Sequence, residues 1–226
     1  MLKPRKRLVK AKLKEDRFVI LTAKAEVWFE EHRQHVLYGV VAVVAAVALG
    51  LAIGWSKSST AKNAAFDEMM ARDAFARAAF DSALIRANAI LEDYSGTSSA
   101  AVALMLKGRI FEQRAQFEEA FKAYEEVIDD YSDQAYLAFG AYYALGTIAH
   151  GKSDWEKAAE YYEKAASKYP DHFNAAVALL EAGKALDKAH RYPQAKSVYN
   201  KILKDYPKSR SVDAARDNLA KLEFMP

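Results

Sequence analysis

The sequence predicts an all-α protein, with a single transmembrane helix followed by an α-solenoid of about four helical hairpins and a capping helix. Two observations predict this class. The first is an uncharged apolar run over residues 36–55. The second is a set of four tyrosines, each between Asp or Lys and Ser or Pro, that recur 37, 38 and 37 residues apart. A period of this length is typical of arrays that are built from stacked helical hairpins.

The apolar run reads VLYGVVAVVAAVALGLAIGW and is apolar on every face of a helix. Twenty residues at the helical rise span roughly 30 Å, the thickness of the hydrocarbon core of a bilayer. Because no second segment of this kind could form a core with it, we expect a transmembrane helix. A cleaved signal peptide fits less well, since the run is long, 35 residues precede it and residues 56–61 offer no convincing cleavage site.

Residues 1–35 predict a basic cytoplasmic tail and a juxtamembrane amphipathic helix. Seven Lys and Arg residues occur in residues 3–14 without an acidic residue, and such a block is typically disordered and solvated. It could also be attracted to anionic lipids, at about 1 kcal/mol per basic residue, or to ribosomal RNA. The helix is predicted over residues 18–35 by apolar side chains at helical spacing, namely Phe18, Leu21, Ala25, Trp28 and Phe29.

Charge predicts the orientation of the span. Residues 1–35 hold ten basic and five acidic residues, and the remainder holds 23 basic and 25 acidic residues. The positive-inside rule then places the N-terminus in the cytoplasm and the large domain across a bacterial inner membrane, in the periplasm. Because the large domain is not basic, we expect no nucleic-acid partner for it. Gly50 and Gly54 form a GxxxG pair that could support a homodimer.

The segment after the span predicts a linker over residues 56–63 and a repeat domain over residues 64–226. Its recurring tyrosines end the second helix of each hairpin, and three of these helices are predicted over residues 117–131, 155–169 and 192–206. Ser153 and Glu156 predict a capping box, and residues 211–224 predict a capping helix. The marking tyrosines are Tyr94, Tyr131, Tyr169 and Tyr206.

The hairpins resemble the tetratricopeptide repeat over about residues 64–210. In this repeat, small residues let two helices approach and large ones fill the gap to the next pair. Three units match well and a first unit is degenerate, although the period exceeds the usual 34 residues, which leaves the loop shapes and the superhelical pitch open. The matching residues of the three units are Leu104, Gly108, Phe111, Ala120 and Tyr124, then Tyr142, Leu145, Gly146, Ala158, Tyr162, Ala165 and Pro170, then Leu179, Gly183, Leu186, Ala195, Tyr199 and Pro207. The first unit has Met70, Ala71, Ala83 and Ile90.

One motif suggests nucleotide binding, and its context argues against it. Residues 146–153, GTIAHGKS, match the phosphate-binding pattern GxxxxGK[ST]. That loop needs a strand before it and free backbone N–H groups. Gly146 instead occupies the small-residue position of a repeat helix, so we expect Gly151 to end this helix and Ser153 to cap the next. Without cysteines or a metal-binding histidine pattern, we expect no enzyme, no metal and no cofactor.

The concave surface of such an array is therefore the expected site for peptides or partner proteins. By repeat register, its predicted binding residues are Arg72, Phe75, Met105, Arg109, Tyr143, Thr147, Leu180 and Lys184. The same register adds Glu68, Glu112, His150 and Asp187 to the lining. Arg72, Arg109 and Lys184 share one position in three units and could form a basic ladder for an extended or acidic peptide. The alternative is that they are isolated surface charges.

The whole architecture resembles the YfgM-type family of ancillary subunits of the SecYEG translocon. Trp28-Phe29, Gly39 and Gly54-Trp55 carry this resemblance. It implies association with translocon components, periplasmic chaperones and emerging chains, with membrane lipids contacted through residues 1–55. The alternative class is an envelope-assembly or cell-division scaffold without a direct translocon role.

Overall fold

The computed structural model describes residues 6–223, except for the side chains of residues 6–16 and 57. Within this range the chain forms nine α-helices and no strand. The chain divides into two units, one ending at Ser58 and the other beginning at Ser59. The helices are α1 (Lys6–Ala76), α2 (Phe80–Asp93), α3 (Ser98–Gln113), α4 (Phe117–Asp130), α5 (Ala135–Gly151), α6 (Trp155–Lys168), α7 (Ala175–Lys188), α8 (Tyr192–Asp205) and α9 (Ser211–Leu222).

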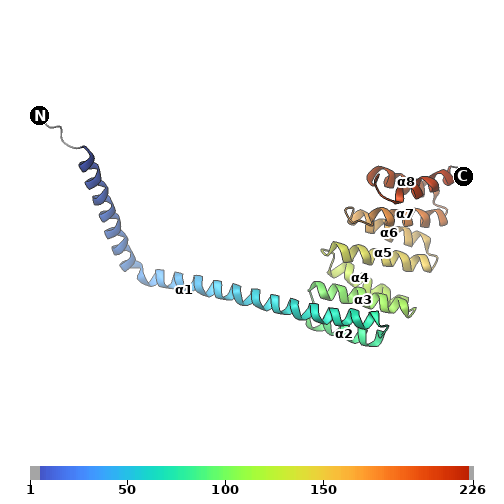
Figure 1. Ribbon diagram of the computed structural model, residues 1–226, viewed down its shortest axis with the longest axis horizontal. Coiled ribbons are helices and arrows are strands. Elements are labelled where there is room, and N and C mark those ends of the chain that lie inside the picture. The colour runs from blue at the N-terminus through green and yellow to red at the C-terminus, as the bar shows by residue number, and fades with distance from the viewer. Residues whose placement is uncertain (1–5, 224–226) are drawn as a thin grey trace. The chain divides into compact units, whose positions relative to one another are not determined.

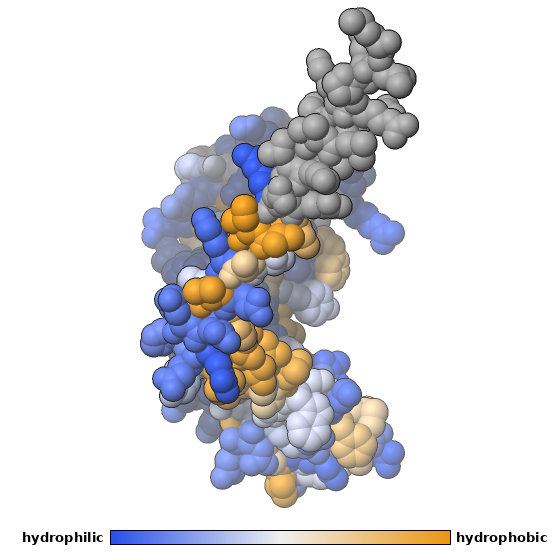
Figure 2. Space-filling model, turned by 90° about the vertical axis from the view of Figure 1, so that its left-hand side faces the viewer, coloured by the Kyte–Doolittle hydropathy of each residue, from blue (hydrophilic) through white to orange (hydrophobic). Residues whose placement is uncertain are grey.

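Helix α1 contains the predicted span, and it is long and apolar enough to cross a membrane. The large apolar side chains of residues 37–55 are all exposed. Figure 2 shows apolar residues in orange on the face turned towards the viewer. Exposing so much apolar surface to water would be strongly unfavourable. Each Val or Leu left in water lacks the roughly 1.5–3 kcal/mol of stabilisation that full burial would give. Lipid is the environment that removes this cost without a protein partner.

Two segments of α1 that flank the apolar run are helical. The stretch predicted as a linker, residues 56–63, contains the boundary between the two units and is helical, because no Gly or Pro interrupts the chain between Trp55 and Ala76. The basic block was expected to be irregular, yet α1 begins at Lys6, and its Lys, Arg, Leu and Ala residues all favour helix. The first residues of that block, including Lys3 and Arg5, lie outside the described residues.

The second unit is an array of helical hairpins, as predicted. The end of α1 shares a hydrophobic cluster with α2, and the following helices pair as α3 with α4, α5 with α6 and α7 with α8. Figure 1 shows these helices stacked in chain order, with α9 against the last hairpin. The three predicted second helices are confirmed to within one residue, and the predicted capping helix is α9.

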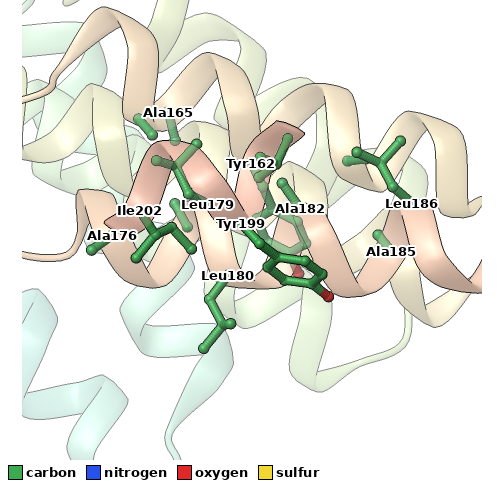
Figure 3. Close-up of a cluster of buried hydrophobic side chains, with 14 of the residues drawn as sticks. Tyr162, Ala165, Ala176, Leu179, Leu180, Ala182, Ala185, Leu186, Tyr199 and Ile202 are labelled. Atoms are coloured by element: carbon green, nitrogen blue, oxygen red, sulfur yellow. The ribbon is translucent and has the colours of Figure 1, made fainter. Parts of the chain in front are cut away.

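A glycine and a tyrosine pack against each other at the centre of three hairpins. A Cβ atom placed on Gly108 would lie 2.5 Å from the ring of Tyr124, and one on Gly146 would lie 2.7 Å from the ring of Tyr162. Gly183 faces the equivalent Tyr199, whose ring lies beside α7 in Figure 3. The first helix therefore needs a residue without a side chain where the second helix inserts a buried ring.

The recurring tyrosines at the helix ends link successive units. The hydroxyl of Tyr169 donates a hydrogen bond to the carbonyl oxygen of Ser132 at 3.0 Å, and that of Tyr206 donates to Pro170 at the same distance. The hydroxyl of Tyr131 accepts a hydrogen bond from the Gly96 N–H at 3.1 Å. Each bond crosses from one hairpin to the loop of the preceding one, which explains why this residue marks the period.

The turn within the third hairpin differs from the prediction. Ser153 does not cap α6, because its φ of +60° puts it in the left-handed turn that ends α5. The capping residue is Asp154, whose carboxylate accepts a hydrogen bond from the Lys157 N–H at 3.3 Å. Gly151 is the last residue of α5, as predicted. The left-handed turn recurs at the equivalent residues Ala78, Ala115 and His190.

Candidate functional site

The first helices of the second and third hairpins approach each other, as do the first helix of the last hairpin and the capping helix. Besides their hairpin partners, α3 contacts α5 and α7 contacts α9. First helices that approach one another in this way form the inner side of a helical array. The predicted binding residues all lie on α1, α3, α5 and α7, at equivalent positions of these helices.

The cations of the predicted ladder each have a local partner. Arg72 forms an ion pair with Glu68 at 2.8 Å, and Lys184 forms one with Glu181 at 2.8 Å. The guanidinium of Arg109 lies over the ring of Phe75, 4.7 Å from its centroid. Exposed pairs of this kind contribute about 0–1 kcal/mol each, so a partner could displace them at small cost.

Buried tyrosine hydroxyls reach this surface from the second helices. The Tyr124 hydroxyl donates a hydrogen bond to the carboxylate of Glu112 at 2.8 Å. In the next unit, the hydroxyl oxygens of Tyr162 and Thr147 are 3.3 Å apart, and the Tyr143 and Tyr162 ring centroids are 5.0 Å apart. Burial raises the pKa of Tyr124, Tyr143 and Tyr162, so their hydroxyls are neutral and can donate hydrogen bonds.

Leu180 lies at the predicted position, but only 8% of it is exposed. It packs within the hydrophobic core of the C-terminal hairpins. In Figure 3 it points to a different side of α7 from Leu179. Leu180 therefore supports this surface from beneath and offers little area for contact with a partner.

A cavity of about 310 Å³ opens on the inner surface between α3, α5 and the start of α7. Two of its residues, Met105 and Tyr143, belong to the predicted site. The sequence-based prediction missed Tyr136 and Phe173, which are 65% and 73% exposed. The complete lining comprises Met105, Tyr136, Leu137, Phe139, Gly140, Tyr143, His172, Phe173, Asn174 and Val177.

Aromatic rings form a stacked row along this cavity. The rings of Phe139 and His172 are 3.7 Å apart and nearly parallel, and those of His172 and Phe173 are 4.5 Å apart. Tyr136 lies 5.3 Å from His172. The Nδ1 atom of His172 accepts a hydrogen bond from the Asn174 N–H at 3.2 Å, and burial lowers the pKa of the imidazole. His172 is therefore a neutral ring in an apolar stack.

The repeat register could have revealed part of this cavity. Tyr136 and Phe173 are 37 residues apart and occupy the same position in two adjacent units. An aromatic residue repeated at the start of two successive hairpins is a periodic signal, and the structure shows both of its members at the rim of one cavity. Phe139 and His172 carry no such signal, because the equivalent positions hold other residue types.

The phosphate-binding motif has no corresponding structure. Gly146 and Gly151 both belong to α5, so the backbone N–H groups of this segment are used within the helix. Among the residues that the structure describes, no group of three His, Cys, Asp or Glu side chains is placed to hold a metal ion.

Comparison with protein families supports the repeat assignment. The tetratricopeptide repeat is found over residues 102–133 and again over residues 137–208. No curated protein matches the chain. The fold and these matches define an α-solenoid of tetratricopeptide repeats, a class of protein–protein interaction module that binds proteins or peptides.

Proposed function

We propose that the protein is a membrane-anchored interaction module that binds an extended peptide or partner segment on its inner surface, and that it is not an enzyme. The observation that supports this most strongly is the aromatic cavity, where Tyr136 and Phe173 leave most of their surface exposed. Burying a Leu- or Phe-sized side chain contributes about 1.5–3 kcal/mol. A cavity of about 310 Å³ can accept one such side chain as an anchor.

The proposed setting is the periplasmic face of a bacterial inner membrane, beside the translocon. The apolar span of α1 and the basic residues before it support this anchoring and orientation. A tethered groove meets emerging chains at high effective concentration, so a modest affinity per site is enough for their transfer to periplasmic chaperones. The resemblance to the YfgM-type family motivates this setting.

Photocrosslinking in native membranes tests the proposal. A photoreactive amino acid at Tyr136, Tyr143 or Arg109 should capture emerging chains or translocon components. The matched control is the same amino acid at Glu126, which is exposed on the second helix α4. Adducts of equal yield at Glu126, or no translocon component and no emerging chain at any groove position, would contradict the proposal.

The absence of native cysteines makes the membrane part testable by single-cysteine variants. Under the proposed orientation, a cysteine at Gln34 should react with a membrane-impermeant maleimide only after lysis, and one at Ser59 should react in intact spheroplasts. If a homodimer forms through Gly50 and Gly54, the variant Gly50→Cys should form a disulfide between two copies of the chain. A Cβ at either glycine meets no other atom within 4 Å, so the position is open.

A further inference from the structure

A second cavity lies on the second helices, between α6 and α8. Its volume is about 820 Å³, and its floor includes Leu179 and Leu186 from α7. Ala159 and Val198 face it from the two second helices. We call this cavity the α6–α8 cleft. Its remaining lining is polar and comprises Glu156, Glu160, Glu163, Lys164, Ser167, Arg191, Gln194, Ser197 and Lys201.

The preceding pair of second helices shows how the equivalent space is filled. Between α4 and α6, the rings of Phe121 and Tyr161 meet edge to face, with centroids 6.0 Å apart. The ammonium of Lys157 lies 5.2 Å from the centroid of the Phe121 ring. By repeat register, Ala159 replaces Phe121 and Val198 replaces Tyr161 in the α6–α8 pair. The α6–α8 cleft is therefore the space that two aromatic rings fill one repeat earlier.

The charges around the α6–α8 cleft are not all paired. Arg191 pairs with Glu156, and Lys164 pairs with Glu160 at 2.6 Å. Glu163 is half-buried in the cleft and forms no ion pair among the residues that the structure describes. Burial raises the pKa of this carboxyl group, and the attraction to Lys201 only partly opposes it. Because Lys201 is exposed and remains hydrated, the desolvated group that lacks a partner is the carboxylate.

We propose that the α6–α8 cleft is a second docking site, which receives an aromatic side chain of a partner protein next to a basic residue. The aromatic ring would occupy the space that Phe121 and Tyr161 fill between α4 and α6, above Leu179 and Leu186. The basic residue would pair with Glu163. An acidic neighbour in the partner is disfavoured, since it would meet the desolvated carboxylate.

This site is independent of the inner groove, because it lies on the second helices and shares no lining residue with the aromatic cavity. A chain or chaperone could therefore occupy each surface at the same time. The two sites can also fail separately, so a test of one leaves the other standing.

The test uses the full chain in detergent and three fluorescent seven-residue peptides of Gly and Ser. The first carries a central Phe followed by Arg, the second replaces Phe by Ala, and the third replaces Arg by Glu. Fluorescence anisotropy should show saturable binding of the first peptide. The Kd should rise at least about fivefold for each of the other two, because the ring loses its burial or the charge meets Glu163.

Two variants locate the binding. The double variant Ala159→Phe with Val198→Tyr copies the α4–α6 contact, and it should raise the Kd of the first peptide at least about fivefold. Glu163→Lys changes only a charge at the wall, and it should remove the preference for Arg over Glu, which keeps the proposal testable if the filled variant does not fold. The control Glu126→Ala, at an exposed position of α4 outside both cavities, should leave the Kd unchanged. Equal affinity for the three peptides, or unchanged binding in both cleft variants, would overturn the proposal.

Discussion

Two apolar helical segments of this protein have opposite surroundings. Residues 36–55 of α1 are apolar on every side, and the large side chains from Leu37 onward are all exposed. Helix α5, Ala135–Gly151, is also apolar on most sides, yet α3, α4 and α6 contact it. The first segment is long and apolar enough to cross a membrane, whereas neighbouring helices supply an apolar environment to the second. Apolar composition alone therefore does not distinguish a membrane span from the central helix of a solenoid; length and partners do.

The largest expected effect is a difference in the free energy of unfolding between two leucine-to-alanine variants, one in α5 and one in the apolar run of α1. Leu145→Ala in α5 removes a fully buried side chain and should destabilise the repeat array by about 2–5 kcal/mol. Leu49→Ala in the span leaves no cavity in protein and should not change the unfolding of the array. Urea unfolding of the full chain in detergent, followed by circular dichroism, measures both. A similar loss for Leu49→Ala would mean that the span is part of the folded core.

Substituting a glycine should also destabilise the repeat array when the glycine lies in α5 and not when it lies in the apolar run of α1. Gly146→Ala forces a methyl group against the buried Tyr162 ring and should cost about 1–3 kcal/mol. Gly50→Ala meets no neighbour within the chain and should leave the midpoint of unfolding unchanged. If Gly50 mediates a homodimer, this variant should instead weaken crosslinking between copies. A neutral Gly146→Ala would show that the Gly–Tyr contact does not set the spacing of the hairpin.

Replacing alanine by glycine should raise the stability of the array at a left-handed turn and lower it inside a helix. Ala115 has a φ of +56°, which costs a residue with a Cβ about 1 kcal/mol or more. Ala115→Gly should therefore stabilise the array by about 0.5 kcal/mol after the entropy of the unfolded glycine is subtracted. Ala89→Gly, at an exposed position inside α2, should destabilise by about 1 kcal/mol. Destabilisation at both positions in thermal unfolding would contradict the role of the left-handed turn.

The smallest expected effect is a pH dependence from His172. Burial lowers its pKa from the ordinary value of 6.5, so the unfolded chain binds more protons than the folded chain near that pH. Stability should therefore decrease as the pH falls through 6.5 towards the lower pKa of the folded state. Comparing the Tm of the natural chain and of His172→Phe between pH 7.5 and 5.5 isolates this contribution. A parallel pH dependence in both chains would assign the effect to other groups.

The sequence predicted the second helices accurately, because each one is amphipathic and ends at a tyrosine in a fixed place. It misplaced the cap of α6, since Ser153 and Asp154 are both good capping residues and only the backbone shows which one follows the left-handed turn. Of the predicted binding residues, Met105 and Tyr143 line the aromatic cavity. The sequence-based prediction missed Phe139 and His172, because their stacking joins α5 to the loop before α7.

The sequence by itself determined what depends on period and composition, namely the apolar run of α1, the repeat length and the recurrence of a glycine and a tyrosine at fixed places in three hairpins. These features are local or recur at fixed spacing, so they can be recognised in the linear sequence. The tertiary structure decided what depends on the approach of separate units. The aromatic cavity forms where α3, α5 and the start of α7 meet, and the α6–α8 cleft forms where Ala159 and Val198 are too small to fill the gap. Neither space belongs to a single segment, so only the packing of neighbouring repeats reveals it.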